Sequence, residues 1–145
     1  MPKYNSFKEQ MRRNLVALIS LVVAITSLSY NSWRNEQSEE NRTQRLVAID
    51  ALMKLGELQQ LVYHNHYDRD TTDKGNPRTG WTLVLIIRDI TTILEEPLPQ
   101  ASESLRATWA AHWANLGDST EAKDAIEDSI ESLRGDLLAM LSALD

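Results

Sequence analysis

The first long hydrophobic run of the chain lies near its amino end, within the segment RRNLVALISLVVAITSLSYNSW at residues 12–33. From Leu15 to Tyr30 it contains no charged residue, and its polar interruptions are small serine and threonine side chains that can bond back to their own helix. Counted to Trp33, the run has 19 residues, and a helix of that length measures about 28 Å, close to the hydrocarbon thickness of a bilayer. A core helix would instead gather polar residues on one face. We therefore predict a transmembrane helix over residues 14–33.

The residues at both ends of this run are those that membrane interfaces favour. Arg12 and Arg13 precede it, and Tyr30 and Trp33 close it, where amphipathic rings prefer the headgroup layer. Since basic residues close to a membrane stay on its cytoplasmic side, we expect residues 1–13 to form a basic cytoplasmic tail. The remainder is then exported, which in a bacterium with two membranes places it in the periplasm, anchored in the inner membrane.

A cleavable export signal is the main alternative. Such a signal has the same basic start and apolar run, and Ser27 and Ser29 could precede a cleavage site. However, the segment holds no Ala-x-Ala motif, and helical sequence continues beyond the site with no Pro or Gly before Gly56. We therefore favour an uncleaved signal-anchor that crosses the membrane once.

Small residues form a strip along the predicted membrane helix: Ala17, Ser20, Ala24 and Ser27. Their spacing of three and four residues places them on one helix face. Because small residues let neighbouring membrane helices approach closely, this strip indicates contact with another membrane subunit or with a second copy.

After the apolar run the chain becomes polar and then amphipathic. Residues 34–45, RNEQSEENRTQR, contain no apolar residue, no Pro and no Gly, which predicts a solvated helical stalk about 18 Å long. From residue 46 onward apolar residues return at helical spacing, so residues 46–145 form the predicted domain. Residues 68–80, with two glycines and a proline, have the composition of a loop.

Four amphipathic helices are expected in this domain. The first has its apolar stripe at Ala48, Leu52, Leu55, Leu58 and Val62, flanked by Ile49 and Leu61. The second covers residues 81–96 and ends at Pro97-Leu98-Pro99. Its inward-facing residues are Leu83, Ile86, Ile87, Ile90, Ile93 and Leu94. The third covers residues 101–116, stops at Gly117, and carries on one face Leu105, Trp109, His112, Trp113 and Leu116. The fourth begins at a capping box formed by Asp118 and Glu121, and its stripe includes Ile126, Ile130, Leu133, Leu137 and Leu144.

Short turns join these helices, and no alternating strand pattern occurs between them. The pattern therefore predicts an all-α fold, in which an N-terminal transmembrane helix continues into an antiparallel bundle of about four helices. Because the chain ends inside the last stripe, we expect neither a second membrane span nor a signalling domain after it.

The distribution of charge narrows the choice of partners. The formal net charge is −6, and after Trp33 eleven basic residues face twenty acidic ones, a balance of −9. An acidic body disfavours nucleic acid, whose binding needs a basic face, whereas the basic amino end suits an anionic cytoplasmic leaflet. The chain has no cysteine, which excludes disulfides, thiolate metal sites and cysteine nucleophiles.

One short segment concentrates potential metal ligands, namely His64, His66, Asp68 and Asp70. On a continuing helix His64 shares a face with Asp68, and His66 shares a face with Asp70. Imidazole with carboxylate suits zinc or another divalent ion, provided that further ligands come from elsewhere. Such short motifs often match by chance, so we favour a polar helix end that runs into a solvated loop.

A histidine lies between two tryptophans on the third apolar stripe. Trp109, His112 and Trp113 share one helix face, and residues in that position most often pack in a core. The alternative is a groove for an apolar partner, because tryptophan is enriched at the centres of binding interfaces.

No catalytic signature is present in the sequence. It contains no nucleophile elbow, phosphate-binding loop, HExxH helix or dinucleotide fingerprint, and we expect neither catalysis nor an organic cofactor. The sequence favours a membrane-anchored, non-catalytic accessory or scaffolding subunit, in contact with the lipid bilayer and with other membrane subunits. The alternative is a periplasmic helical domain that senses a ligand or a metal. This alternative rests on an analogy of fold alone with the anchored helical bundles of bacterial receptors.

Overall fold

The computed structural model of the chain describes residues 7–144, apart from the side chains of Phe7 and Arg13. Within that range it contains four α-helices, one short 3-10 helix and no strand, so the prediction of an all-α fold is confirmed. The elements are α1 (Phe7–Tyr67), α2 (Pro77–Thr91), α3 (Leu98–His112), η1 (Trp113–Asn115) and α4 (Thr120–Ala143). By its internal contacts the chain divides into two compact units, Met1–Glu40 and Asn41–Asp145.

In the first unit, helix α1 is exposed along its whole described length. Its nine large apolar side chains between Leu15 and Leu28 are each 55–70 % exposed. Thr26 satisfies its hydroxyl inside this run by donating to the carbonyl oxygen of Val22 at 2.8 Å. Among the described helices, α1 alone is long and apolar enough to cross a membrane, with a mean hydropathy of 1.8 over its most apolar window.

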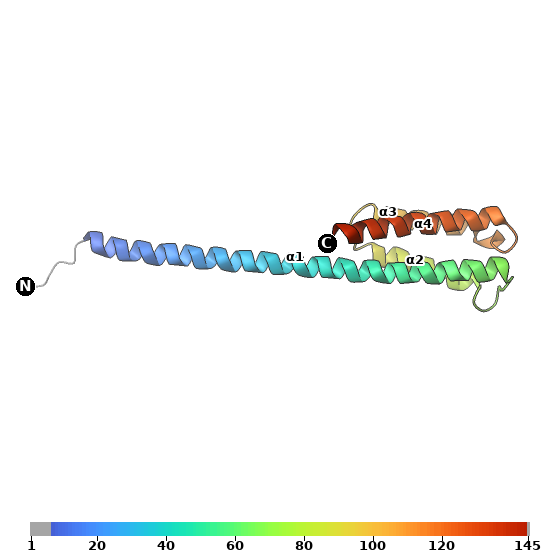
Figure 1. The fold of residues 1–145 in the computed structure, drawn as a ribbon, viewed down its shortest axis with the longest axis horizontal. Helices are drawn as coiled ribbons and strands as arrows, with labels where there is room; N and C mark the ends of the chain where they lie inside the picture. The colour runs from blue at the N-terminus through green and yellow to red at the C-terminus, as the bar shows by residue number, and fades with distance from the viewer. Residues whose placement is uncertain (1–6, 145) are drawn as a thin grey trace, which may run out of the picture. The chain divides into compact units, whose positions relative to one another are not determined.

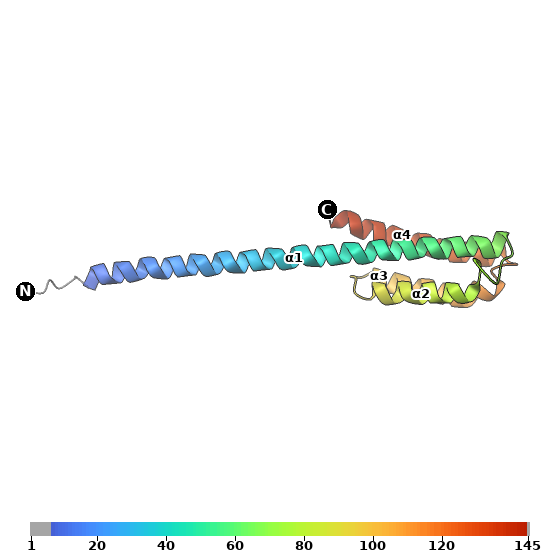
Figure 2. The ribbon, with the colours of Figure 1, turned by 90° about the horizontal axis from the view of Figure 1, so that it is seen from below.

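In the second unit, the carboxyl-terminal part of α1 lies side by side with α2 and α4, and α3 packs against α2 and α4 (Figure 1 and Figure 2). One apolar core lies between these segments, and all four contribute to it. Its largest fully buried side chains are Leu55, Leu58, Val62, Ile87, Leu98, Leu105, Trp109, Leu116, Ile126, Ile130, Leu133 and Leu137.

The apolar stripes of α1 and α4 are buried as the helical spacing predicts. Every predicted position of α4 from Ile126 to Leu137 is fully buried, and on α1 only Leu52 is half-exposed within its stripe. The prediction was wrong for Ile86 and Ile93, which were expected to point inward and are 36 % and 61 % exposed. Ile49, expected to flank the stripe of α1, is 48 % exposed.

Helix α2 lies four to five residues closer to the amino end than predicted. It begins at Pro77, because the side chain of Asn76 caps it by accepting the backbone N–H of Arg78 at 3.0 Å. It ends at Thr91, so the predicted helical spacing no longer applies at Ile93. Asn76 and Pro77, which the sequence analysis placed in a loop, therefore form the start of this helix.

The boundaries of α3 and α4 also differ from the prediction. Helix α3 begins at Leu98 directly after Pro97, and the turn after it is not closed by a left-handed Gly117, since no described glycine has a positive φ. Helix α4 is capped one residue later than predicted: the hydroxyl of Ser119 accepts the backbone N–H of Ala122 at 3.0 Å. Asp118 is thereby free to pair with Arg69.

Candidate functional site

Two turns of the second unit, residues 68–76 and 113–119, meet around the last turn of α1. Asn65 is 2 % exposed and donates from Nδ2 to the carbonyl oxygen of Gly75 at 2.8 Å. Arg69, the described residue with a positive φ of 56°, donates to the carbonyl oxygen of Gly117 and pairs with Asp118 at 2.6 Å. Asn65 at the end of α1 and Arg69 in the loop directly after it therefore hold both turns in place.

The carboxylate of Asp70 organises the first of these turns. Its two oxygens accept the backbone N–H groups of Thr72, Asp73, Lys74 and Gly75 at 2.8–3.3 Å. These hydrogen bonds stabilise the charged form, and those from Asp73 and Thr72 contribute most to lowering the pKa of Asp70 to about 2. Asp70 thus acts as an anionic cap on successive N–H groups of the turn.

Close backbone approach makes glycine necessary in the same turn. A Cβ atom at Gly75 would lie 2.1 Å from the carbonyl oxygen of Asp70 and 2.5 Å from the backbone nitrogen of Asn65. Both obstacles are backbone atoms that cannot rotate away. Any side chain at residue 75 would therefore force the turn away from α1.

Of the four predicted metal ligands, His64 and Asp68 bond to each other, whereas His66 and Asp70 each bond to backbone groups. The Nδ1 atom of His64 lies 2.6 Å from a carboxylate oxygen of Asp68, and that of His66 lies 2.8 Å from the carbonyl oxygen of Leu116. Asp70 faces the N–H groups of its own turn. In the part of the chain that the structure describes, no three His, Asp or Glu side chains converge as a metal site would require. Metal binding stays the less favoured hypothesis, with His64 and Asp68 as its closest pair.

The three residues of the predicted partner groove separate into core and surface. Trp109 is fully buried, and His112 is half-buried. Trp113 is 37 % exposed, and its ring meets the edge of Trp81 with 6.4 Å between centroids. The aromatic pair available to a partner is therefore Trp81 with Trp113, of which the sequence interpretation missed Trp81.

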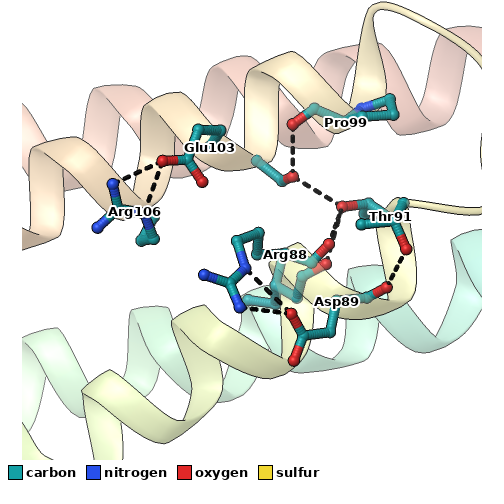
Figure 3. A network of polar contacts seen from close by, with 9 residues as sticks. Arg88, Asp89, Thr91, Pro99, Glu103 and Arg106 are labelled. Carbon is teal, nitrogen blue, oxygen red and sulfur yellow. Dashed lines mark hydrogen bonds and ion pairs between the residues drawn. The ribbon is translucent and has the colours of Figure 1, made fainter.

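A buried pair of hydroxyls joins α2 to α3. Thr91 and Ser102 are both fully buried, and their oxygens lie 2.7 Å apart. Ser102 donates in turn to the carbonyl oxygen of Pro99 at 2.9 Å, as Figure 3 shows beside the surface ion pairs of Arg88 with Asp89 and Glu103 with Arg106. The hydroxyls bond to each other and to backbone, an arrangement that stabilises the fold.

Lys123 is the described lysine with the least exposed side chain. Its Nζ lies 2.6 Å from Asp124 and 2.8 Å from Glu127, and 6.0 Å from the centre of the Tyr67 ring. Hydrogen bonds to Asp124 and then Glu127 raise the pKa of Lys123 above its ordinary value. An amine nucleophile needs the opposite shift, so this lysine is held as a cation that joins α4 to the end of α1.

The membrane-interface residues can be placed only in part. Tyr30 and Trp33 lie one helical turn apart with their ring centroids 6.1 Å from each other. Arg12 is exposed, whereas the side chain of Arg13 lies outside the described residues. The small strip Ala17, Ser20, Ala24 and Ser27 is exposed along its length.

An apolar surface that the sequence interpretation missed lies on α1 in the second unit. Five large side chains point away from the core there, and we call them the outer stripe: Leu46, Ile49, Met53, Tyr63 and Tyr67. Their signal in the sequence is the spacing of three and four residues, offset by two from the stripe that enters the core.

Comparisons of the chain with protein-family models, curated proteins and solved structures found no match.

Proposed function

We propose that this protein is a single-pass, N-terminally anchored membrane protein that displays a helical domain outside the cytoplasm. The domain is an antiparallel four-helix bundle, and it serves as a non-catalytic accessory or scaffolding subunit beside other membrane proteins. In a bacterium with two membranes the domain lies in the periplasm.

The proposal of a membrane anchor rests on one observation: the apolar run of α1 is exposed along its length. None of its most apolar window is buried, unlike that of a core helix. Nine large apolar side chains are at least half exposed there, and burying each contributes roughly 1.5–3 kcal/mol, so transfer of the run into lipid is favoured by on the order of 10 kcal/mol. A bilayer provides that burial over the right length.

The polar clusters of the domain support a scaffold in preference to an enzyme. Asp70 is occupied by backbone N–H groups, Lys123 by two carboxylates, and Thr91 by Ser102. Each cluster joins neighbouring elements of the fold. Exposed apolar side chains, in contrast, gather in the outer stripe, where a partner could bury them.

Orientation in the membrane is testable because the chain contains no cysteine. We would introduce single cysteines as Gln10→Cys before the apolar run and Ala107→Cys on α3, both at exposed positions, and treat intact cells with a membrane-impermeant maleimide. The proposal requires labelling of Ala107→Cys in intact cells and of Gln10→Cys only after permeabilisation. The reverse pattern would overturn the orientation.

The scaffolding role is tested by purification of the full chain in a mild detergent. A membrane protein that recurs at fixed stoichiometry with the chain is expected. Purification as a lone monomer in every mild detergent would contradict the role as a subunit. In either case the labelling experiment tests the membrane anchor independently of this purification.

A further inference from the structure

Helix α1 carries two apolar seams on opposite sides in the second unit. The inner seam enters the core and is buried at Ala48, Ala51, Leu55, Leu58, Val62 and Asn65. The outer stripe begins two residues earlier, at Leu46, and follows the same alternation of three and four residues. Two residues correspond to about 200° around a helix, so the two seams face away from each other.

The outer stripe is largely exposed in the part of the chain that the structure describes. Leu46, Ile49 and Met53 are 61 %, 48 % and 61 % exposed, and Tyr63 and Tyr67 are 41 % and 64 % exposed. Isolated exposed apolar residues are common on protein surfaces, but five at one helical period are not. An apolar surface laid against this row would bury these side chains.

The spacing of the row matches the seam of a coiled coil. Positions 46, 49, 53, 56, 60, 63 and 67 alternate by three and four residues over a length of about 33 Å. Gly56 and Gln60 occupy the middle of this row, and a Cβ atom added at Gly56 would meet nothing within 4 Å. A glycine allows close approach there, and one polar residue in a seam favours a single register.

We propose that the outer stripe packs against the outer stripe of a second copy, forming a parallel, in-register coiled coil. A two-fold axis places each seam residue opposite its own counterpart, so one stripe supplies both surfaces. The inference rests on the proposed membrane anchor, because anchoring gives all copies the same orientation and therefore favours parallel pairing.

The area of the stripe fits a dimer that depends on anchoring. Aromatic side chains bury roughly 150–250 Å² each when fully covered and aliphatic ones less, and those of the stripe are about half exposed. Complete covering of five from each copy therefore buries at most about 1,000 Å² together, the lower limit for a specific interface. Confinement to a membrane raises the local concentration and makes such a weak contact sufficient.

Neighbouring apolar side chains widen the surface at one end of the stripe. Ile93 is 61 % exposed and shares a shallow groove between α1 and α2 with Leu46, Val47, Asp50 and Ile90. Its exposure, which the helical pattern did not predict, adds contact area next to Leu46.

Disulfide crosslinking of the full chain in membranes tests the proposal. We would place single cysteines in the stripe as Ile49→Cys and Met53→Cys, with controls Ala107→Cys on α3 and Leu138→Cys on α4, all exposed positions. After mild oxidation the stripe variants should form at least fivefold more disulfide-linked homodimer than Ala107→Cys. Adding Ile49→Asp to Met53→Cys should reduce that yield at least fivefold while leaving the tryptophan fluorescence of the folded chain unchanged.

The outcomes that would contradict the dimer differ from the outcome that would contradict the anchor. Equal yields at stripe and control positions would mean random collision and overturn the dimer, as would crosslinks only to a different protein. Absence of homodimer from chains that still resist carbonate extraction would refute the dimer and leave the anchor intact. Chains that wash off the membrane would refute the anchor itself.

Discussion

The indole ring of Trp109 fills the space that a side chain at residue 80 would need. A Cβ atom added at Gly80 would lie 2.2 Å from the nearest carbon of that ring. Trp109 is fully buried and Gly80 lies in the first turns of α2, so this contact sets how closely α2 and α3 pack. Glycine costs helix stability, and its presence inside α2 is explained by the ring.

We therefore expect Gly80→Ala to destabilise the protein. Overpacking of this kind costs roughly 1–3 kcal/mol, more than the gain of up to about 1 kcal/mol from replacing glycine in a helix. Gly135→Ala is the matched control: a Cβ atom at Gly135 in α4 meets nothing within 4 Å, so that variant should be more stable than the parent chain. Unfolding in urea, followed by tryptophan fluorescence, measures both. A Gly80→Ala variant as stable as Gly135→Ala would refute the packing.

Asp70 should make stability depend on pH in the acid range. Its pKa is lowered from the model-compound value of 3.8 to about 2 by backbone hydrogen bonds. A lowered pKa contributes stability that is present above pH 3.8 and is lost as the pH falls through 2. Asp70→Asn should therefore lower the melting temperature at pH 7, and the difference from the parent chain should shrink steadily as the pH falls from 3.8 toward 2.

The matched control for this change is Asp73→Asn, an exposed carboxylate in the same turn. Melting temperatures of the full chain in detergent, recorded by near-ultraviolet circular dichroism between pH 7 and pH 2, provide the comparison. Equal effects of the two substitutions at all pH values would show that Asp70 has no special role in the turn.

The Thr91–Ser102 pair should contribute modestly to stability. Ser102→Ala removes the hydroxyl that lies 2.7 Å from Thr91 Oγ1, and loss of a buried hydrogen bond between neutral groups costs about 1 kcal/mol. Ser104→Ala is the control, because Ser104 is exposed two residues along the same helix. A loss for Ser104→Ala as large as that for Ser102→Ala, in urea unfolding, would contradict the role of the pair.

Zinc should leave the thermal stability of the full chain unchanged. His64 bonds to Asp68, His66 bonds to the carbonyl oxygen of Leu116, and Asp70 caps its own turn. A metal would have to break these contacts to assemble its ligands. Melting with and without zinc measures the effect. A rise in melting temperature that His64→Ala and His66→Ala each abolish would establish the metal site after all.

The helical period predicts the core best where a helix has one apolar face and clear ends. Helix α4 fits this description, and its stripe from Ile126 to Leu137 is buried as expected. On α1 two apolar faces share the same period, so the spacing that predicts the inner seam does not by itself separate it from the outer stripe. Ile49, which the spacing places at the flank of the inner seam, belongs to the outer stripe.

Contacts between turns could not be predicted from spacing. The roles of Asp70 and Gly75 depend on a loop that closes against Asn65, and His66 bonds to a residue fifty positions away. Such contacts follow from how the helices pack. The apolar run before Trp33, in contrast, needs no tertiary information, because length and hydropathy alone relate it to a bilayer.

The most direct measurement is carbonate extraction of membranes from cells that express the full chain, combined with the intact mass of the extracted protein. An uncleaved anchor predicts that the chain stays in the membrane pellet at alkaline pH and has the mass of a polypeptide that retains residues 14–33. A soluble protein whose mass corresponds to a polypeptide that begins near Tyr30 would contradict the account.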